Sequence, residues 1–234
     1  MAGISCRGVA PPRLVGAGKL SRSFMSAIRA VAFDVFGTLC QIAGPRAPFK
    51  QLLSLCPSLA SEWRRTLMCQ DMGITDLAIK LPIALSPADI SALEIDLQIE
   101  LASISLYPEV IATIEELNQQ GIKLALISNL AAPYADPVRR LIAGQIETQI
   151  WSFDTGFIKP EPEIFEILVR RLGCEPNEIL MVGDSLKADV GGARKAGLNA
   201  ILLDRTKRYV FTESISDLRA LIPLIERWSQ LKRG

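Results

Sequence analysis

The stretch VAFDVFGTLC, residues 31–40, decides the fold class of this chain. It begins as an apolar, β-rich run, ends that run at the charged residue Asp34, and passes through Gly37 into a turn. Such a run is typical of a buried strand in a parallel sheet, where ligands bind beyond the carboxyl ends of the strands. Two residues after Asp34, where a second carboxylate would form a catalytic pair, the chain has Phe36. The central question raised by this stretch is therefore what chemistry Asp34 can perform without that partner.

Four more β-rich runs follow along the chain, and helical patterns separate the later ones. They lie at 122–129, 148–156, 178–185 and 199–204. Strands that alternate with helices of about ten to fifteen residues indicate right-handed βαβ units. We therefore expect an α/β fold with a Rossmann-like parallel sheet core and helices on both faces. A last helix is expected from about residue 215, with Pro223 kinking or dividing it.

The interval 44–105 interrupts this alternation, because its apolar residues recur at helical spacing throughout. Ser86 and Pro87 have the chemistry of an N-cap and a first helical residue. We expect residues 44–105 to form a small all-helical cap domain. It would be inserted into a core made of residues 30–43 and 106–234.

The composition of the 234 residues excludes several function classes. The chain contains no histidine, which rules out histidine triads, histidine-ligated zinc and imidazole catalysis. A formal net charge of +1 indicates no general attraction to nucleic acid or to an anionic membrane. No apolar run approaches the roughly 18 residues that span a bilayer. Five scattered cysteines favour a reduced, cytoplasmic compartment.

Residues 1–29 differ from the rest of the chain, because they carry five basic residues and no acidic one. We expect a basic N-terminal extension without fixed structure, or an upstream start with Met25 as a second initiator. An organelle transit peptide is the alternative, since such peptides are also rich in arginine and serine and poor in acidic residues.

Polar side chains follow the predicted strands at the points where the strands end. They are Asp34, Ser128, Asn129, Lys159, Asp184 and Asp189. Because parallel strands end at one edge of the sheet, we expect these side chains to converge. Clustered carboxylates attract a hard cation, for which Mg²⁺ fits best. A metal beside a lysine suits a phosphoryl or other anionic group, so we expect a small anionic substrate.

Four ordered segments resemble the motifs of the haloacid dehalogenase-like hydrolase superfamily. They are FDVFGTL, LISN, IKPEPEIF and GDSLKADVGGARKAG, all within residues 30–204. One such segment alone would be a weak signal, whereas four in this order are a strong one. The resemblance implies a Rossmann-like sheet, a helical cap after the first motif, and hydrolysis through an aspartate nucleophile.

The resemblance also implies a role for each matching residue. The implied magnesium ligands are Asp34, the backbone carbonyl of Phe36, Asp184 and Asp189. The implied catalytic and substrate-binding groups are Asp34 as nucleophile, Lys159 to offset charge, Ser128 and Asn129 on the transferring group, and Thr38 in support of the turn.

Phe36 departs from the phosphatases of this superfamily, which have an aspartate there that protonates the leaving group. A phenyl ring cannot donate a proton, and general acid–base help is worth roughly 10²–10⁴ in rate. We therefore expect a slow phosphatase, or one that recruits another acid. The candidates in the cap are Glu62, Asp71 and Asp76.

An aromatic residue at position 36 resembles the 2-haloacid dehalogenases of the superfamily, in which halide leaves without a proton. Arg64 or Arg65 then resembles their arginine for the substrate carboxylate. The acidic GDSLKAD segment argues against this alternative, as does Phe165, where those enzymes have a tyrosine. A third hypothesis is that the chain is a catalytically weak, phosphate-binding regulatory protein. The sequence leaves a monomer and a homodimer equally open.

Overall fold

The computed structural model describes residues 27–209 and 213–230. Most of the predicted N-terminal extension, residues 1–26, lies outside them. The strands are β1 Ala30–Phe33, β2 Cys40–Ile42, β3 Ile104–Leu106, β4 Lys123–Ser128, β5 Thr148–Trp151, β6 Ile179–Gly183, β7 Asn199–Leu203 and β8 Ser214–Ile215. The helices are α1 Pro48–Ser54, α2 Ala60–Cys69, α3 Ile74–Lys80, α4 Pro87–Ala102, α5 Val110–Gln119, α6 Ala135–Leu141, α7 Ser152–Thr155, α8 Pro162–Leu172, α9 Gly192–Lys195 and α10 Leu221–Gln230. Shorter helical turns are η1 Ala132–Tyr134, η2 Pro176–Glu178, η3 Leu186–Gly191 and η4 Leu218–Ala220.

Six of the described strands form one parallel sheet in the order β5-β4-β1-β6-β7-β8. The strand that precedes Asp34 is central, because Phe33 is in register with Leu126 of β4 and with Val182 of β6. All four residues of β1 are completely buried. A strand buried on both faces needs apolar side chains at every position, which explains why its sequence does not alternate. The predicted α/β fold is confirmed.

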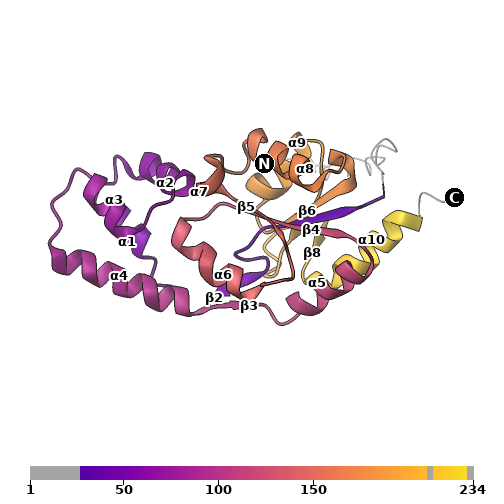
Figure 1. The fold of residues 1–234 in the computed structure, drawn as a ribbon, viewed down its shortest axis with the longest axis horizontal. Coiled ribbons are helices and arrows are strands. Elements are labelled where there is room, and N and C mark those ends of the chain that lie inside the picture. The colour runs from indigo at the N-terminus through magenta and orange to yellow at the C-terminus, as the bar shows by residue number, and fades with distance from the viewer. Residues whose placement is uncertain (1–26, 210–212, 231–234) are drawn as a thin grey trace, which may run out of the picture.

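Helices cover both faces of this sheet, and the two faces have separate apolar cores. Val31 and Phe33 pack with residues of α5, α6 and α10, whereas Ala30 and Ala32 pack with residues of α8 and α9. This division follows from the strand geometry, since successive side chains point to opposite faces. Figure 1 shows α8 and α9 on one side of the sheet and α5 and α10 on the other.

Helices α1 to α4 lie between β2 and β3, to one side of the sheet (Figure 1). The chain leaves and re-enters the core through the antiparallel pair of β2 and β3, in which Cys40 faces Leu106. The four helices have an apolar core of their own, centred on fully buried residues such as Leu52 and Leu77. Ser86 caps α4 by accepting a hydrogen bond from the Asp89 backbone N–H. Treating residues 44–105 as a cap domain remains our prediction.

Three local features differ from the sequence-based expectations. The run at 148–156 is a strand only as far as Trp151, because Ser152–Thr155 turn into the short helix α7. A two-residue strand, β8, which the sequence-based expectations did not include, lies between β7 and the last helix. The last helix begins at Leu221, so Pro223 lies in its first turn, where a missing backbone N–H breaks no intrahelical hydrogen bond. None of the helices in the described part of the chain combines the length and apolarity needed to cross a bilayer.

Candidate active site

Asp34 stands at the carboxyl end of the central strand, where the three middle strands of the sheet end together. Its backbone N–H donates to the carbonyl of Val182 at 2.9 Å, which continues the pairing of β1 with β6 for one more residue. Ser128 is the last residue of β4, and Asp184 directly follows β6. The parallel arrangement therefore brings these three side chains to one edge of the sheet, as the sequence predicts.

Lys159 links two carboxylates inside this site. Its ammonium Nζ lies 2.6 Å from Asp34 Oδ1 and 2.7 Å from Asp189 Oδ1, and it donates to the Ile127 carbonyl at 2.7 Å. Lys159 is 3% exposed, and Asp34 is 9% exposed. Ser128 Oγ donates to Asp34 Oδ1 at 3.1 Å. The same oxygen of Asp34 thus accepts hydrogen bonds from a lysine and a hydroxyl, which leaves Oδ2 without these two donors.

Asn129 positions Lys159 through its backbone. The Asn129 side chain donates to the Lys159 carbonyl at 2.8 Å and accepts from the Lys159 N–H at 2.7 Å. This reciprocal pair fixes the loop between α7 and α8 against the end of β4. The resemblance implied a contact between Asn129 and the substrate, whereas both of its amide atoms bind this loop.

The electrostatics of the cluster follow from burial and from crowded negative charge. Burial, followed by the charges of Asp189 and Asp184, raises the pKa of Asp34 to about 6, against the opposing effect of Lys159. Burial lowers the pKa of Lys159, but the charges of Asp189 and Asp34 outweigh burial and raise it. Burial and the charge of Asp189 raise the pKa of Asp184. Three carboxylates around one ammonium therefore leave uncompensated negative charge.

Asp34, Asp184 and Asp189 form a cluster that fits a divalent cation. Each offers one carboxylate oxygen, and these three oxygens lie within 4.8 Å of one another. Two glycines make room for the cluster. A Cβ atom at Gly37 would lie 2.4 Å from Asp184 Oδ2, and one at Gly183 would lie 2.3 Å from the carboxyl carbon of Asp189. An all-oxygen donor set with surplus negative charge suits Mg²⁺.

Asp189 reaches the cluster from η3, the π-helical turn that follows β6. The turn is capped by Ser185, whose Oγ accepts from the Ala188 N–H at 3.1 Å. The Ser185 N–H in turn donates to Asp189 Oδ2 at 2.9 Å. π-Helical turns are often found at functional sites, because the extra residue re-aims a side chain. The sequence spacing of Asp184 and Asp189 did not show this turn.

Phe36 and Thr38 belong to the turn after Asp34. The Phe36 ring packs edge-on against the Tyr134 ring, with centroids 5.9 Å apart and an angle of 85° between the planes. Thr38 is completely buried, and its hydroxyl has no hydrogen-bond partner within the described ranges. Neither side chain supplies an acid to the site. The Tyr134 hydroxyl donates a hydrogen bond to Glu100 Oε1 at 2.6 Å, and burial raises the pKa of Tyr134.

The cap residues singled out in the sequence lie on exposed surfaces. Arg65 pairs with Glu161, at 2.5 Å between Nη1 and Oε1, and is half exposed. Its neighbour Arg64 is exposed. The three candidate acids of the cap are also exposed: Glu62, Asp71 and Asp76. Asp76 caps α3 by accepting from the Gly73 N–H at 2.9 Å. None of the contacts found for these residues reaches Asp34.

Arg205 is a residue of the site region that the sequence analysis missed. It follows the end of β7, at the same edge of the sheet as Asp34, and donates to the carbonyls of Gly37 and Thr38. The position of an arginine two residues after a strand of the parallel sheet was the signal that could have identified it.

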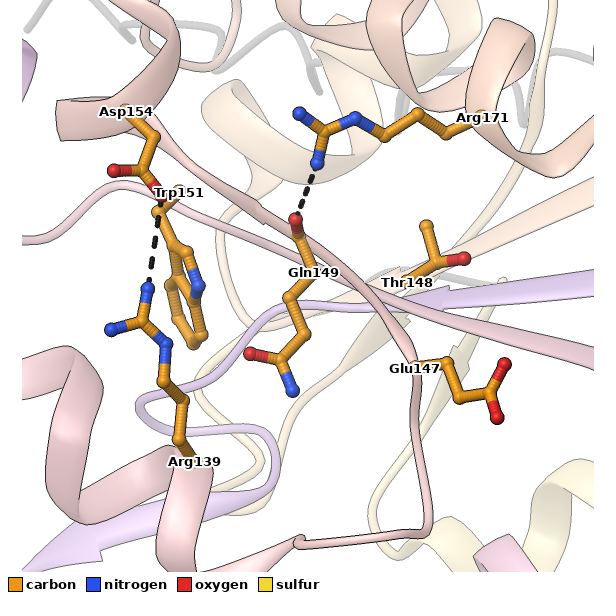
Figure 2. Close-up of a pocket in the computed structure, with 7 residues that line it drawn as sticks. All are labelled: Arg139, Glu147, Thr148, Gln149, Trp151, Asp154 and Arg171. Atoms are coloured by element: carbon orange, nitrogen blue, oxygen red, sulfur yellow. Dashed lines mark hydrogen bonds and ion pairs between the residues drawn. The ribbon is translucent and has the colours of Figure 1, made fainter.

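An open cavity of about 540 Å³ lies elsewhere, along the edge strand β5 (Figure 2). The Arg139 guanidinium lies 5.5 Å from the centre of the Trp151 ring and 3.7 Å from Asp154 Oδ2. Arg171 donates to the Gln149 carbonyl at 2.7 Å, as the dashed line in Figure 2 shows. Among the charged residues that line the cavity, Arg139 and Asp154 are paired with each other and Arg171 is bound to the backbone. None of the predicted site residues lines this cavity, so it is separate from the carboxylate cluster.

Comparison with protein families agrees with this geometry. Residues 28–197 match the family model described as "Hydrolase: haloacid dehalogenase-like hydrolase". The matched range contains all six polar residues at the strand ends and the whole helical insertion.

Relatives with assigned activities fall into two groups. The chain is 34% identical over 116 residues to the ribulose-1,5-bisphosphate 5-phosphatase of Halopiger xanaduensis, covering 49% of this chain and 48% of that protein. It is 28% identical over 229 residues to (S)-2-haloacid dehalogenase 4A of Burkholderia cepacia, covering 87% and 97%. A third relative is the phosphoserine phosphatase of Thermus thermophilus, 36% identical over 49% of this chain and 47% of its own. The chain thus spans about half the length of these two phosphatases.

Solved structures share the fold. The HAD phosphatase of Thermococcus onnurineus has a TM-score of 0.59 at 24% identity, covering 84% of this chain and 97% of that one. The 2-haloacid dehalogenase of Pseudomonas syringae has a TM-score of 0.61 at 24% identity, covering 86% and 99%. At this identity the likeness concerns the fold alone.

Proposed function

The chain belongs to the haloacid dehalogenase-like hydrolases, and we propose that within this family it is a Mg²⁺-dependent phosphatase of small phosphorylated substrates. The observation that carries the proposal is the cluster of Asp34, Asp184 and Asp189 around the ammonium group of Lys159. A halide-releasing site needs no metal, whereas phosphoryl transfer uses one to neutralise developing charge. Three converging carboxylates are therefore better matched to a phosphatase.

In this proposal Asp34 is the nucleophile. Its carboxylate oxygen forms a bond to phosphorus while the bond from phosphorus to the ester oxygen breaks, which produces an aspartyl phosphate and an alkoxide or phenolate that takes a proton from solvent water. Water then attacks phosphorus, restoring the carboxylate and releasing inorganic phosphate. The hydrogen bonds from Lys159 and Ser128 hold Oδ1 of Asp34, and this orients the carboxylate with Oδ2 directed to the reacting atom.

Asp34, Asp184 and Asp189, with the backbone carbonyl of Phe36, would hold Mg²⁺. When bound, the cation would supply positive charge beside the transferring phosphoryl group. Lys159 would offset the charge of the phosphoryl group electrostatically, because its three N–H groups already bind Asp34, Asp189 and the Ile127 carbonyl. The Ser128 hydroxyl would exchange its hydrogen bond to Asp34 for one to a phosphoryl oxygen when substrate binds. Ser128 is 2% exposed and Lys159 is 3% exposed, so these buried side chains would also shield the nucleophile from bulk water.

The missing proton donor limits this phosphatase. The ring of Phe36 occupies the position of the family's general acid and packs against Tyr134. Tyr134 does not replace the acid, because its raised pKa and its hydrogen bond to Glu100 hold its proton. Esters whose alcohols leave without protonation should therefore react fastest. Simple alkyl phosphates should react slowly, by roughly the 10²–10⁴ that an acid contributes.

The test is a panel of an aryl phosphate and small phosphate esters, assayed with and without Mg²⁺, with Asp34→Asn as the blank. The expected result is Mg²⁺-dependent release of phosphate, fastest for the aryl ester. Release no faster than that of Asp34→Asn would reject a phosphatase. If phosphate analogues then still stabilised the protein in a Mg²⁺-dependent way, a phosphate-binding regulatory role would be supported instead.

A second candidate is a 2-haloacid dehalogenase, which Phe36 favours because halide leaves without a proton. The likeness to the Burkholderia cepacia enzyme, over nearly its whole length, adds to this candidate. Attack by Asp34 on the halogen-bearing carbon would form an ester and release halide. Halide release from 2-chloropropionate in the presence of EDTA is the discriminating measurement, and its absence would discard this candidate.

A further inference from the structure

Four backbone hydrogen bonds lie within the turn after Asp34, one of them from the Gly37 N–H to the Cys40 carbonyl at 2.9 Å, and the other three share an acceptor. The backbone N–H groups of Thr38, Leu39 and Cys40 all donate to one acceptor, the Val35 carbonyl, at 2.8–3.2 Å. Gly37 has a φ of +80°, so this turn adopts a conformation that residues with side chains rarely take. The turn carries the backbone carbonyl of Phe36 and lies directly against Asp184. Its placement therefore decides the spacing of the site.

The side chain of Arg205 forms hydrogen bonds to the backbone of this turn. Its Nε donates to the Gly37 carbonyl at 3.2 Å, and its Nη2 donates to the Thr38 carbonyl at 2.6 Å. The two carbonyls belong to successive residues, so the planar guanidinium holds the turn at two points rather than one. A lysine, with its single ammonium group, could not reproduce this fork.

Arg205 is itself held rigidly from the other side. Its Nη1 lies 2.6 Å from Glu109 Oε1, and its guanidinium carbon lies 3.6 Å from the centre of the Tyr107 ring. The Glu109 side chain is 8% exposed and that of Arg205 is 16% exposed. The Tyr107 N–H also donates to the Leu39 carbonyl at 3.0 Å. The Glu109 carboxylate and the Tyr107 ring therefore fix the guanidinium of Arg205 from the segment that follows β3.

We propose that Arg205 is a positioning residue for the reaction of Asp34, with Glu109 and Tyr107 as its supports. By fixing the Gly37 and Thr38 carbonyls, Arg205 sets where the Phe36 carbonyl and the Asp34 carboxylate stand relative to Asp184. The inference rests on the proposed use of Asp34 as nucleophile. It adds a residue that lies outside the four motifs, 171 positions after Asp34. A displacement of about 1 Å at such a site lowers the rate by about 10²-fold.

The test compares Arg205→Lys, which keeps the charge, and Arg205→Met, which keeps only the stem. The matched control is Arg29→Lys, which changes an exposed arginine paired with Glu178 at the opposite end of β1. We expect both Arg205 variants to lower kcat for the aryl phosphate by roughly 10–100-fold while KM changes little, since the substrate is held by other groups. The control should leave both constants unchanged.

A second measurement does not depend on turnover. Hydrogen–deuterium exchange of a peptide covering residues 35–40 should quicken by roughly fivefold in the Arg205 variants, the factor expected for a lost hydrogen bond. Titration calorimetry should show weaker Mg²⁺ binding in the same variants. Peptides from α8 should exchange as in the parent protein, which separates a local effect from general loosening.

The outcomes separate the two proposals. Unchanged exchange at 35–40 overturns the role of Arg205, whatever the activity. Faster exchange with unchanged kcat and unchanged Mg²⁺ affinity also overturns it, because the turn would then move without effect on the site. If the parent protein turns over no substrate, the phosphatase proposal is rejected, but the positioning role of Arg205 is not rejected by that result. Weaker Mg²⁺ binding in the Arg205 variants would still support the positioning of the cluster.

Discussion

Lys159 and Asp34 form a buried ion pair, with 2.6 Å between Nζ and Oδ1, at the carboxyl end of the central strand. The same ammonium group pairs with Asp189 at 2.7 Å. A buried charge that loses its partner is strongly destabilising, because neither water nor another ion replaces it. The pair therefore links the stability of the metal-free protein to the residues proposed for its chemistry.

Replacing Lys159 with methionine should destabilise the metal-free protein by roughly 3–5 kcal/mol at pH 8, since three carboxylates would then face one another. Urea unfolding measures the change. Lys123→Met is the matched control, because Lys123 is exposed and donates to a backbone carbonyl, that of Leu172, at 2.7 Å. Equal losses in the two variants would show that the ion pair is not the cause.

Phe36→Asp should raise phosphatase activity on alkyl phosphates by up to roughly 10²–10⁴-fold, because it supplies the missing proton donor. The variant also loses the edge-on contact with Tyr134, which is worth about 0.5–1.5 kcal/mol. Steady-state kinetics on an alkyl and an aryl ester measure the gain, which should be larger for the alkyl ester. Phe36→Asn, which has no acid, should show no gain. A folded Phe36→Asp protein with unchanged or lower activity would contradict the explanation.

The metal-free protein should lose stability as the pH rises from about 4 to about 6. The pKa of Asp34 is 3.8 in an unfolded chain and about 6 in the folded one, so the folded state binds more protons between these values. Thermal unfolding against pH measures this slope, and Asp34→Asn should reduce it. Mg²⁺ should stabilise the parent protein more at pH 7 than at pH 5, because its ligands must be ionised. An equal Mg²⁺ effect at both pH values would argue against Asp34 as a ligand.

Gly37→Ala should weaken Mg²⁺ binding by roughly 10–100-fold, because the added methyl group pushes on Asp184. Gly121→Ala is the matched control. Gly121 has a φ of +72°, close to the +80° of Gly37, but its added Cβ would meet no atom within 4 Å. Both variants should therefore share the strain of a left-handed residue, about 1–2 kcal/mol. Titration calorimetry should show a changed Mg²⁺ affinity in Gly37→Ala alone.

Arg65→Ala and Glu161→Ala should change KM by the same factor, and the double variant should add nothing further. The two residues pair at 2.5 Å between α2 and the loop that follows Lys159, so each should act through this contact rather than on substrate. Their coupling should be no more than about 1 kcal/mol, as for other exposed pairs. Lys50→Ala, on the exposed face of α1, is the control. A rise in KM with Arg65→Ala alone would indicate direct binding of substrate by Arg65.

Much of the fold could be predicted because its signals are local. The continuous apolar run before Asp34 and the helical spacing of the insertion each reflect one element and its burial. The short helix after Trp151 and the π-helical turn that carries Asp189 were not predicted, since both depend on contacts with neighbouring strands. The start of α10 was also not predicted, because a proline such as Pro223 breaks a helix when it lies in the interior but is tolerated in the first turn.

The sequence by itself determined which side chains stand at the ends of the strands, because parallel strands end at one edge whatever the rest of the chain does. It also determined the absence of a histidine and of an acid at Phe36. Only the tertiary structure decided that Asn129 and Arg65 bind other residues of the protein, and that Arg205 reaches back to the turn after Asp34. These contacts join residues 30 to 168 positions apart, and side-chain direction over such separations is set by packing rather than by local sequence.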